Sequence, residues 1–270
     1  MKLLRTVSVG ERPISVCHHD DVTYVGNDKE FTIERITADG EVQKNFIKLD
    51  GYVSSLMVSD DEIFVAVCAS STEEHKIKVF DLDGCSIRSW KRDDCGNYLN
   101  KLGICGDKVV MPNRKNKTLT VYSLDGQMIK SVPLPQINDN QVSMSAAGNN
   151  YVVISHHSSN TVFKVDINTG ETLWSSKHVQ LPQGIVCYRD RYVLLTKQGS
   201  STTVYILDAT TGKMLEISTL TISCMSLWYI YSKCVVHLFD HLNYSRGVFE
   251  NRLKLVCGSS LHKIWQLLVP

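Results

Sequence analysis

The sequence carries almost no net charge, because 29 lysines and arginines balance 28 aspartates and glutamates. No overall field therefore marks the chain as a partner of nucleic acid or of an acidic surface. The chain also lacks any Cys-x-x-Cys pair, and its nine cysteines are odd in number. This pattern predicts a reduced, cytoplasmic protein rather than a disulfide framework.

The sequence also gives little sign of a leader or a membrane span. Residues 1–9 contain two basic residues but no long apolar core, so they do not resemble a signal peptide. Residues 217–239 are largely apolar, but they include Lys233 and six serines and threonines. This composition favours buried strands over a helix that crosses a bilayer.

Features of several enzyme and repeat classes are missing as well. No glycine-rich phosphate loop precedes a helix, and no 3.6-residue periodicity occurs in any repeat, which excludes a helical solenoid. Adjacent carboxylates, as in Asp20-Asp21 and Asp60-Asp61-Glu62, stand where turns are expected, and turns favour aspartate for backbone reasons. We therefore predict no catalytic residue, no metal site and no cofactor.

What the sequence does contain is a repeat of strand, tight turn and strand. It is clearest at Thr118–Val132, where Asp125-Gly126 supplies the positive φ angles that a two-residue hairpin turn needs. The turn returns at Asp39-Gly40, Asp83-Gly84, Thr169-Gly170 and Thr211-Gly212, so that the turn glycines lie 42 or 44 residues apart. Four short strands in each period predict an all-β fold, a β-propeller of four-stranded antiparallel blades. A β-sandwich, the structural alternative, would not give such even spacing.

We expect six blades, of which the last is irregular. Five repeats are bounded at about residues 12–51, 52–98, 99–140, 141–182 and 183–220. Residues 2–9 resemble an outer fourth strand and are expected to close the last blade, because an open ring would expose apolar faces and sheet edges. Residues 221–270 lack the turn dipeptide where the spacing requires one, and they predict an irregular or partial blade. The whole chain, residues 1–270, is thus predicted to be a single propeller domain.

The strand-and-turn cores at His75–Gly84 and Thr118–Gly126 resemble NHL repeats. NHL repeats form six-bladed propellers, and the order of outer strand, five repeats and partial blade is similar to theirs. The resemblance covers Leu3 to about Leu220, and it implies a partner-recruiting module as in tripartite-motif (TRIM-NHL) proteins of the ubiquitin pathway. The Asn-His-Leu tripeptide, the ligand spacings of a RING or B-box and coiled-coil heptads are absent. The resemblance therefore implies no ligase activity for this chain.

The fourth and fifth repeats also resemble the quinoprotein motif, through Asn168–Trp174 and Thr210–Lys213. Quinoprotein enzymes are usually larger rings with a bound cofactor and calcium, and the other three repeats lack the motif. Hairpin geometry and blade packing by themselves explain a Thr-Gly turn that is followed by tryptophan.

Propeller topology sorts the polar residues between two faces. Connections between blades and between second and third strands share one face, here called the top face, and the remaining turns form the bottom face. The expected top-face loops are richer in basic groups. Our candidate partner-binding residues there are Arg92, Arg114, Lys115, Lys117, His156, His157, Lys177 and Lys197.

The histidines do not predict a metal site. His18-His19 and His156-His157 are adjacent pairs, whose side chains diverge in an extended strand, and the two pairs fall on opposite faces. His75, His156 and His178 share the top face, but their spacing is not that of catalytic zinc ligands.

We therefore expect a non-enzymatic protein–protein interaction module. RNA binding through the basic loop at Arg114–Lys117 is one alternative, although few aromatic residues lie in the top-face loops for base stacking. A propeller enzyme of lyase or quinoprotein type is the other, and it would need converging histidines or a cofactor pocket in the central channel. No membrane or small-molecule partner is predicted.

Overall fold

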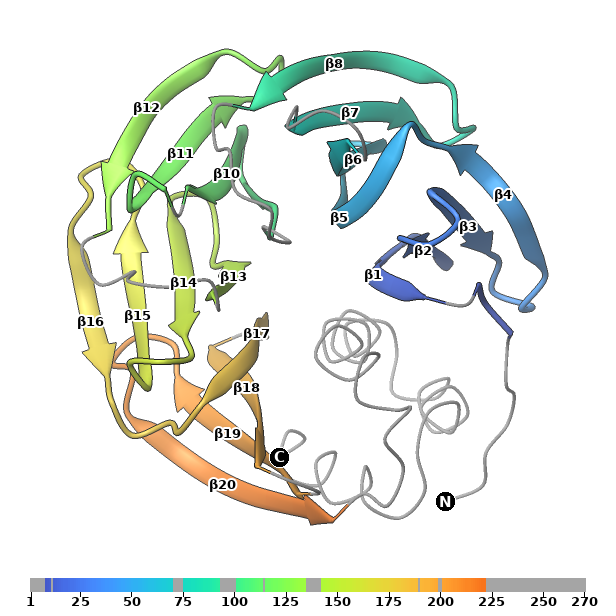
Figure 1. Cartoon of the computed structure of the whole chain (residues 1–270). Coiled ribbons are helices and arrows are strands. Elements are labelled where there is room, and N and C mark those ends of the chain that lie inside the picture. The colour runs from blue at the N-terminus through green and yellow to red at the C-terminus, as the bar shows by residue number, and fades with distance from the viewer. Residues whose placement is uncertain are drawn as a thin grey trace.

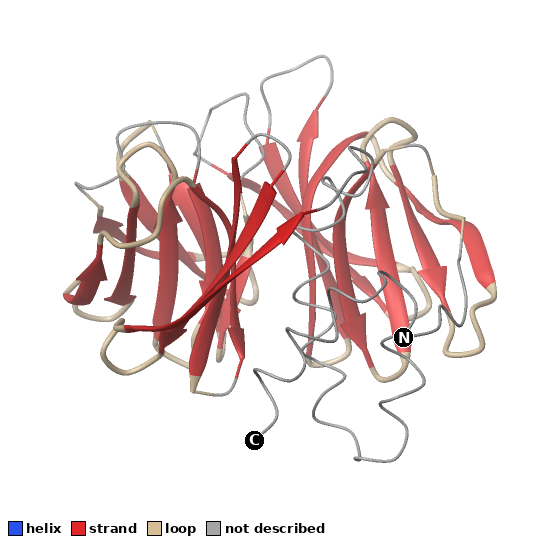
Figure 2. Ribbon diagram, turned by 90° about the horizontal axis from the view of Figure 1, so that it is seen from below, coloured by secondary structure: helices blue, strands red, loops and turns tan. Residues whose placement is uncertain are grey.

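The computed structural model describes residues 8–10, 12–69, 75–92, 101–113, 115–134, 142–188, 190–198 and 201–221. The strands in this part of the chain form five four-stranded antiparallel sheets, which stand as blades around a ring (Figure 1). Seen from the side, the strands run between two faces that carry the loops (Figure 2). No helix in the described ranges is both long and apolar enough to cross a membrane.

Each blade runs in chain order from an inner strand near the ring centre to an outer strand at the rim (Figure 1). Blade one contains β1 (Pro13–His19), β2 (Val22–Asn27), β3 (Thr32–Ile36) and β4 (Val42–Lys48). Blade two contains β5 (Gly51–Ser59), β6 (Glu62–Ala69), β7 (His75–Asp81) and β8 (Ser86–Arg92). Blade three contains β9 (Gly103–Cys105), β10 (Lys108–Asn113), β11 (Thr118–Ser123) and β12 (Met128–Pro133). Blade four contains β13 (Val142–Ala146), β14 (Tyr151–His156), β15 (Thr161–Asp166) and β16 (Thr172–Ser176). Blade five contains β17 (Pro182–Tyr188), β18 (Arg191–Gln198), β19 (Ser201–Asp208) and β20 (Met214–Thr221).

The predicted all-β propeller of four-stranded antiparallel blades is confirmed, with five blades in the described part of the chain. The predicted closing strand and the irregular sixth blade depend mainly on residues 1–7 and 222–270, which lie outside the described residues. Both of these features stay predictions, as does the assignment of the whole chain to one domain.

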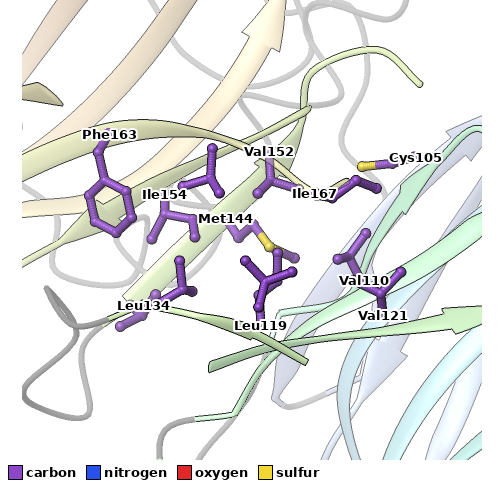
Figure 3. Packing of buried hydrophobic residues seen from close by; sticks show 13 residues of the cluster. Cys105, Val110, Leu119, Val121, Leu134, Met144, Val152, Ile154, Phe163 and Ile167 are labelled. Carbon is purple, nitrogen blue, oxygen red and sulfur yellow. The ribbon is translucent and has the colours of Figure 1, made fainter. Parts of the chain in front are cut away.

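Apolar side chains of neighbouring blades meet to form the core. Between blades three and four, for example, Val110 and Val121 lie in one cluster with Val152 and Phe163, all of them fully buried (Figure 3). Equivalent clusters join blades one and two, two and three, and four and five. This arrangement explains why β6, β10 and β14 contain continuous apolar runs, since both faces of these second strands pack against a neighbouring blade.

The predicted two-residue turn is wrong: at Asp125-Gly126 only the glycine takes a positive φ, and the last strand pair, Tyr122 with Met128, leaves a longer connection. The hairpin glycines also have a second role. Gly126 has a φ of 87°, and a Cβ atom added there would lie 2.4 Å from Trp90 of the preceding blade. Gly212 meets Trp174 in the same way, also at 2.4 Å. The outer strand of one blade therefore packs directly on the turn of the next, and no side chain fits between them.

Serine hydroxyls tie the inner strands of successive blades together. In three cases an inner-strand serine accepts a hydrogen bond from a backbone amide of the following blade. The pairs are Ser15 with Leu56 (3.0 Å), Ser55 with Leu102 (3.2 Å) and Ser145 with Cys187 (3.1 Å). These bonds satisfy amides that a narrow, crowded ring centre would otherwise bury without a partner.

Candidate functional site

The antiparallel order of the blades places several of the predicted site residues at one end of the ring. The β10–β11 turn, the β14–β15 turn and the connection from β16 to β17 all follow strands that run in the same direction. They therefore lie on the top face, as the sequence predicts.

Lys115 and Lys117 are exposed in the β10–β11 turn. This turn has a defined conformation, because the side-chain oxygen of Asn113 accepts a hydrogen bond from the Asn116 amide at 3.1 Å. Lys117 takes a left-handed φ of 52°, and its carbonyl oxygen accepts a hydrogen bond from the Leu134 amide at 2.7 Å. Two cationic side chains are thus presented from a fixed turn.

The top of blade four carries a second basic segment. His157 is half-buried in the β14–β15 turn, and Lys177 and His178 are exposed in the connection to β17. The side-chain oxygen of Asn160 accepts a hydrogen bond from the Leu181 amide at 2.7 Å, which joins this turn to the connection. The structure therefore brings together basic residues that lie about 20 positions apart in the sequence.

The other four predicted site residues are placed differently. Arg92 and His156 lie at the top of their blades, but they are only 4% and 1% exposed. His156 interacts with the Ser159 hydroxyl, at 2.6 Å from its Nδ1 atom. Their burial does not suit direct contact with a partner, so we omit both from the surface proposed below. Arg114 lies outside the described residues, and Lys197 belongs to β18, where its side chain is not described.

A group that the sequence did not predict lies on the bottom face. The Nε2 atom of His19 is 3.1 Å from a carboxylate oxygen of Asp61 and 3.5 Å from one of Asp20. His19 and Asp61 belong to equivalent turns of blades one and two, so only ring assembly brings them together. Their side chains are 25% and 76% exposed.

These three residues could offer a metal one nitrogen and two oxygen ligands, because their ligand atoms lie within 4.8 Å of one another. The hydrogen bond between His19 and Asp61 explains this arrangement without an ion, and we regard the group as a link between blades. Among the described residues, His75, His156 and His178 do not form such a group.

Two of the described cysteines, Cys105 and Cys187, are poor nucleophiles because they are buried. Burial raises the pKa of Cys105 to about 12, and it also raises the pKa of Cys187. Both side chains are therefore neutral thiols at physiological pH, whereas the nucleophile in cysteine catalysis is the thiolate. The five described cysteines are all thiols rather than disulfides.

Comparison with known proteins supports the fold. Residues 97–217, less than half of the chain, match the family model described as outer membrane protein assembly factor BamB. This segment spans the third to fifth repeats and so includes the two that resemble the quinoprotein motif. No curated protein sequence gives a significant match.

Several solved structures share the architecture. A streptogramin B lyase is 15% identical, with a TM-score of 0.61 over 79% of this chain and 70% of the lyase. A selenomethionine-substituted virginiamycin B lyase from Staphylococcus aureus is 14% identical, with a TM-score of 0.57 over 79% and 71% of the two chains. A functionally unknown protein from Desulfotomaculum acetoxidans DSM 771 is 11% identical, with a TM-score of 0.62 over 80% and 72%. At these low sequence identities, the structural similarity establishes the fold alone: this protein is a β-propeller.

Proposed function

We propose that the propeller is a non-enzymatic interaction module that binds an acidic segment of a protein partner on its top face. The observation that carries this proposal is the group of exposed basic side chains Lys115, Lys117, Lys177 and His178, on neighbouring blades three and four. Carboxylates of a partner would pair with the ammonium groups of the three lysines. Because each exposed pair contributes about 0.2–1 kcal/mol, several must act together and the binding would weaken with salt.

The distribution of charge across the ring favours this face over the other. Turns on the bottom face carry exposed aspartates, among them Asp20, Asp61, Asp107 and Asp125. An acidic partner would be repelled by these aspartates and attracted to the top of blades three and four, whereas the top of blade one carries the exposed acidic residues Glu30 and Asp50.

The finer identity of the module is also a proposal. The resemblance of the repeats supports an NHL-type ring with a sixth, irregular blade, which recruits a partner as TRIM-NHL propellers do. The description of the matched family as an assembly factor agrees with a role without catalysis. The cytoplasmic location predicted from the cysteines belongs to the same proposal.

RNA is the second candidate partner, and one observation favours it. Tyr52 is 40% exposed at the start of β5, and its ring packs edge-on against Phe31 with 4.8 Å between the ring centres. Both residues lie on the top face, where Tyr52 could stack on an unpaired base. The same lysines would then neutralise phosphates.

A propeller enzyme is the third candidate, since two of the similar structures are lyases. It would need converging metal ligands or a cofactor pocket in the channel. The histidine–carboxylate group that could hold a metal, among the described residues, lies instead on the bottom face, at His19. We therefore place this function below the two binding functions.

Fluorescence anisotropy with a labelled poly-glutamate peptide and a labelled single-stranded RNA tests the proposal. We expect the peptide to bind at low salt, and the variant with Lys115, Lys117 and Lys177 changed to glutamate to bind it at least about tenfold more weakly. Lys213→Glu, at an exposed bottom-face turn, is the matched control and should bind like the unchanged protein. An equal loss in both variants, or no peptide binding at low salt, would refute the proposal. RNA binding that depends on Tyr52 would support the second candidate instead.

A further inference from the structure

The top of blade one has a polar cluster on the face that points away from blade two. The β2–β3 register pairs Gly26 with Ile33, and these two residues face blade two, since a Cβ atom on Gly26 would lie 2.6 Å from Val53. Side chains alternate along a strand. Asn27, Thr32 and Glu34 therefore share the opposite face.

These polar side chains are buried to an unusual degree. Asn27, Thr32 and Glu34 are 0%, 3% and 1% exposed, and the neighbouring Asp28 is 5% exposed. Both amide atoms of Asn27, the hydroxyl of Thr32 and Oδ1 of Asp28 are buried without a hydrogen-bond partner. Folded proteins rarely bury several such atoms together unless water or an ion binds them.

Comparable positions in other blades are satisfied locally in part, although Thr118, which corresponds to Thr32 in blade three, also buries its hydroxyl without a hydrogen-bond partner. Asn113, which corresponds to Asn27 in blade three, accepts a hydrogen bond from the amide of Asn116 in its own turn. Thr161, which corresponds to Thr32 in blade four, donates a hydrogen bond to the carbonyl oxygen of Ser159 at 3.0 Å. What distinguishes blade one is that four such atoms lie on three residues of one hairpin, Asn27, Asp28 and Thr32.

The charges in the cluster favour a cation. Glu34 accepts a hydrogen bond from the Gly10 amide through one oxygen, at 3.1 Å, and Asp28 pairs with Arg12 through Oδ2, also at 3.1 Å. Two carboxylates against one guanidinium leave a net negative charge. The other carboxylate oxygen of Asp28, Oδ1, is buried without a hydrogen-bond partner, and such an unsatisfied oxygen is costly.

We propose that Asn27, Asp28, Thr32 and Glu34 form a binding site for a hard divalent cation, with calcium as the preferred ion. Carboxylate, amide and hydroxyl oxygens are the ligands that calcium takes. Paired residues such as Asn27 and Thr32 have Cβ atoms about 5 Å apart, and Glu34 lies about 7 Å further along its strand. Calcium accommodates such an irregular set at about 2.4 Å per ligand, whereas magnesium demands a near-ideal octahedron.

The sequence predicted no metal site, because that prediction rested on histidine and cysteine spacing. Here the ligands are oxygens, and only the strand register places them on one face. The proposed ion would bind away from the basic residues of blades three and four. Its role is thus independent of the partner-binding surface proposed above, and it would stabilise the attachment of Gly10 and Arg12 to blade one.

Calorimetric titration with calcium chloride, and thermal unfolding in calcium or in EDTA, test this site on the full chain. We expect calcium to bind and to raise the melting temperature of the unchanged protein. Glu34→Gln keeps the shape but removes one charge, so it should weaken calcium affinity at least about tenfold. In EDTA this variant should melt at or above the temperature of the unchanged protein, which shows that it folds.

Thr161→Val is the matched control, because it alters the corresponding position of blade four and should keep the full response to calcium. Loss of the response in Thr161→Val to the same extent as in Glu34→Gln would overturn the proposal. No calcium binding to the unchanged protein would overturn it as well, and would indicate buried water in the cluster. A stronger response to magnesium than to calcium would refute the choice of calcium.

Discussion

Replacing Gly126 by alanine is expected to destabilise the propeller by about 2–5 kcal/mol, from two separate causes. The first is the backbone: Gly126 has a φ of 87°, and a left-handed conformation costs an L-residue roughly 1–2 kcal/mol. The second is space, because the new methyl group would lie 2.4 Å from the ring of Trp90. Forcing such a contact apart costs about 1–3 kcal/mol.

Gly148 separates these two causes. It has nearly the same φ, 84°, but a Cβ atom added there has nothing within 4 Å. Gly148→Ala should therefore show the backbone cost alone, about 1–2 kcal/mol. In a Trp90→Ala background, Gly126→Ala should also fall to this smaller value, because the ring that it strikes has been removed.

Urea unfolding of the four variants and the unchanged protein, followed by circular dichroism, measures these differences. The reasoning requires Gly126→Ala to cost more than Gly148→Ala, and the excess to disappear in the double variant. If the two single glycine variants were equally destabilised, the contact between Trp90 and the next blade would not restrict the turn, and our account of blade packing would be wrong.

Three further predictions concern the core and the ion pairs. Ser55→Ala should destabilise the protein by about 1–3 kcal/mol in the same urea assay, because it leaves the buried amide of Leu102 without its acceptor. An unchanged free energy of unfolding would mean that this hydrogen bond does not stabilise the ring. Iodoacetamide at mildly alkaline pH should modify the exposed Cys85 but not the buried Cys105, whose pKa is raised to about 12. Mass spectrometry after labelling of the native protein measures this difference, and rapid labelling of both cysteines would show that Cys105 is not buried. Asp50→Asn should reduce the melting temperature slightly at neutral pH, because the hydrogen bond from Lys78 at 2.8 Å lowers the pKa of Asp50. This contribution is present above the unfolded pKa of about 3.9 and is lost as the pH falls through the lower folded value, so a difference that persisted in strong acid would refute it.

Local sequence preferences account for most of the fold. The Asp-Gly and Thr-Gly dipeptides at Gly126 and its counterparts, with β-rich runs on either side, predicted where the hairpins turn, because glycine takes the positive φ that each turn needs. Even the glycine-free turn at Asp20-Asp21 takes positive φ at both residues, 43° and 65°. Such choices depend on neighbours within a few residues, and the regular spacing then implied blades around a ring.

The candidate site was predictable in its position but less so in its members. Strand order was enough to place Lys115, Lys117 and Lys177 on the top face. It could not show that Arg92 and His156 are buried, since their burial depends on how neighbouring strands and blades cover them. Exposure is a property of the assembled ring.

The sequence by itself therefore determined the repeat, the turns and the two faces of this protein, because short-range backbone chemistry sets them. The tertiary structure decided which residues meet across blades that lie some 40 positions apart. It placed Trp90 on Gly126 and His19 beside Asp61. No local pattern encodes these contacts, because each depends on strand register and on the packing of one sheet against the next.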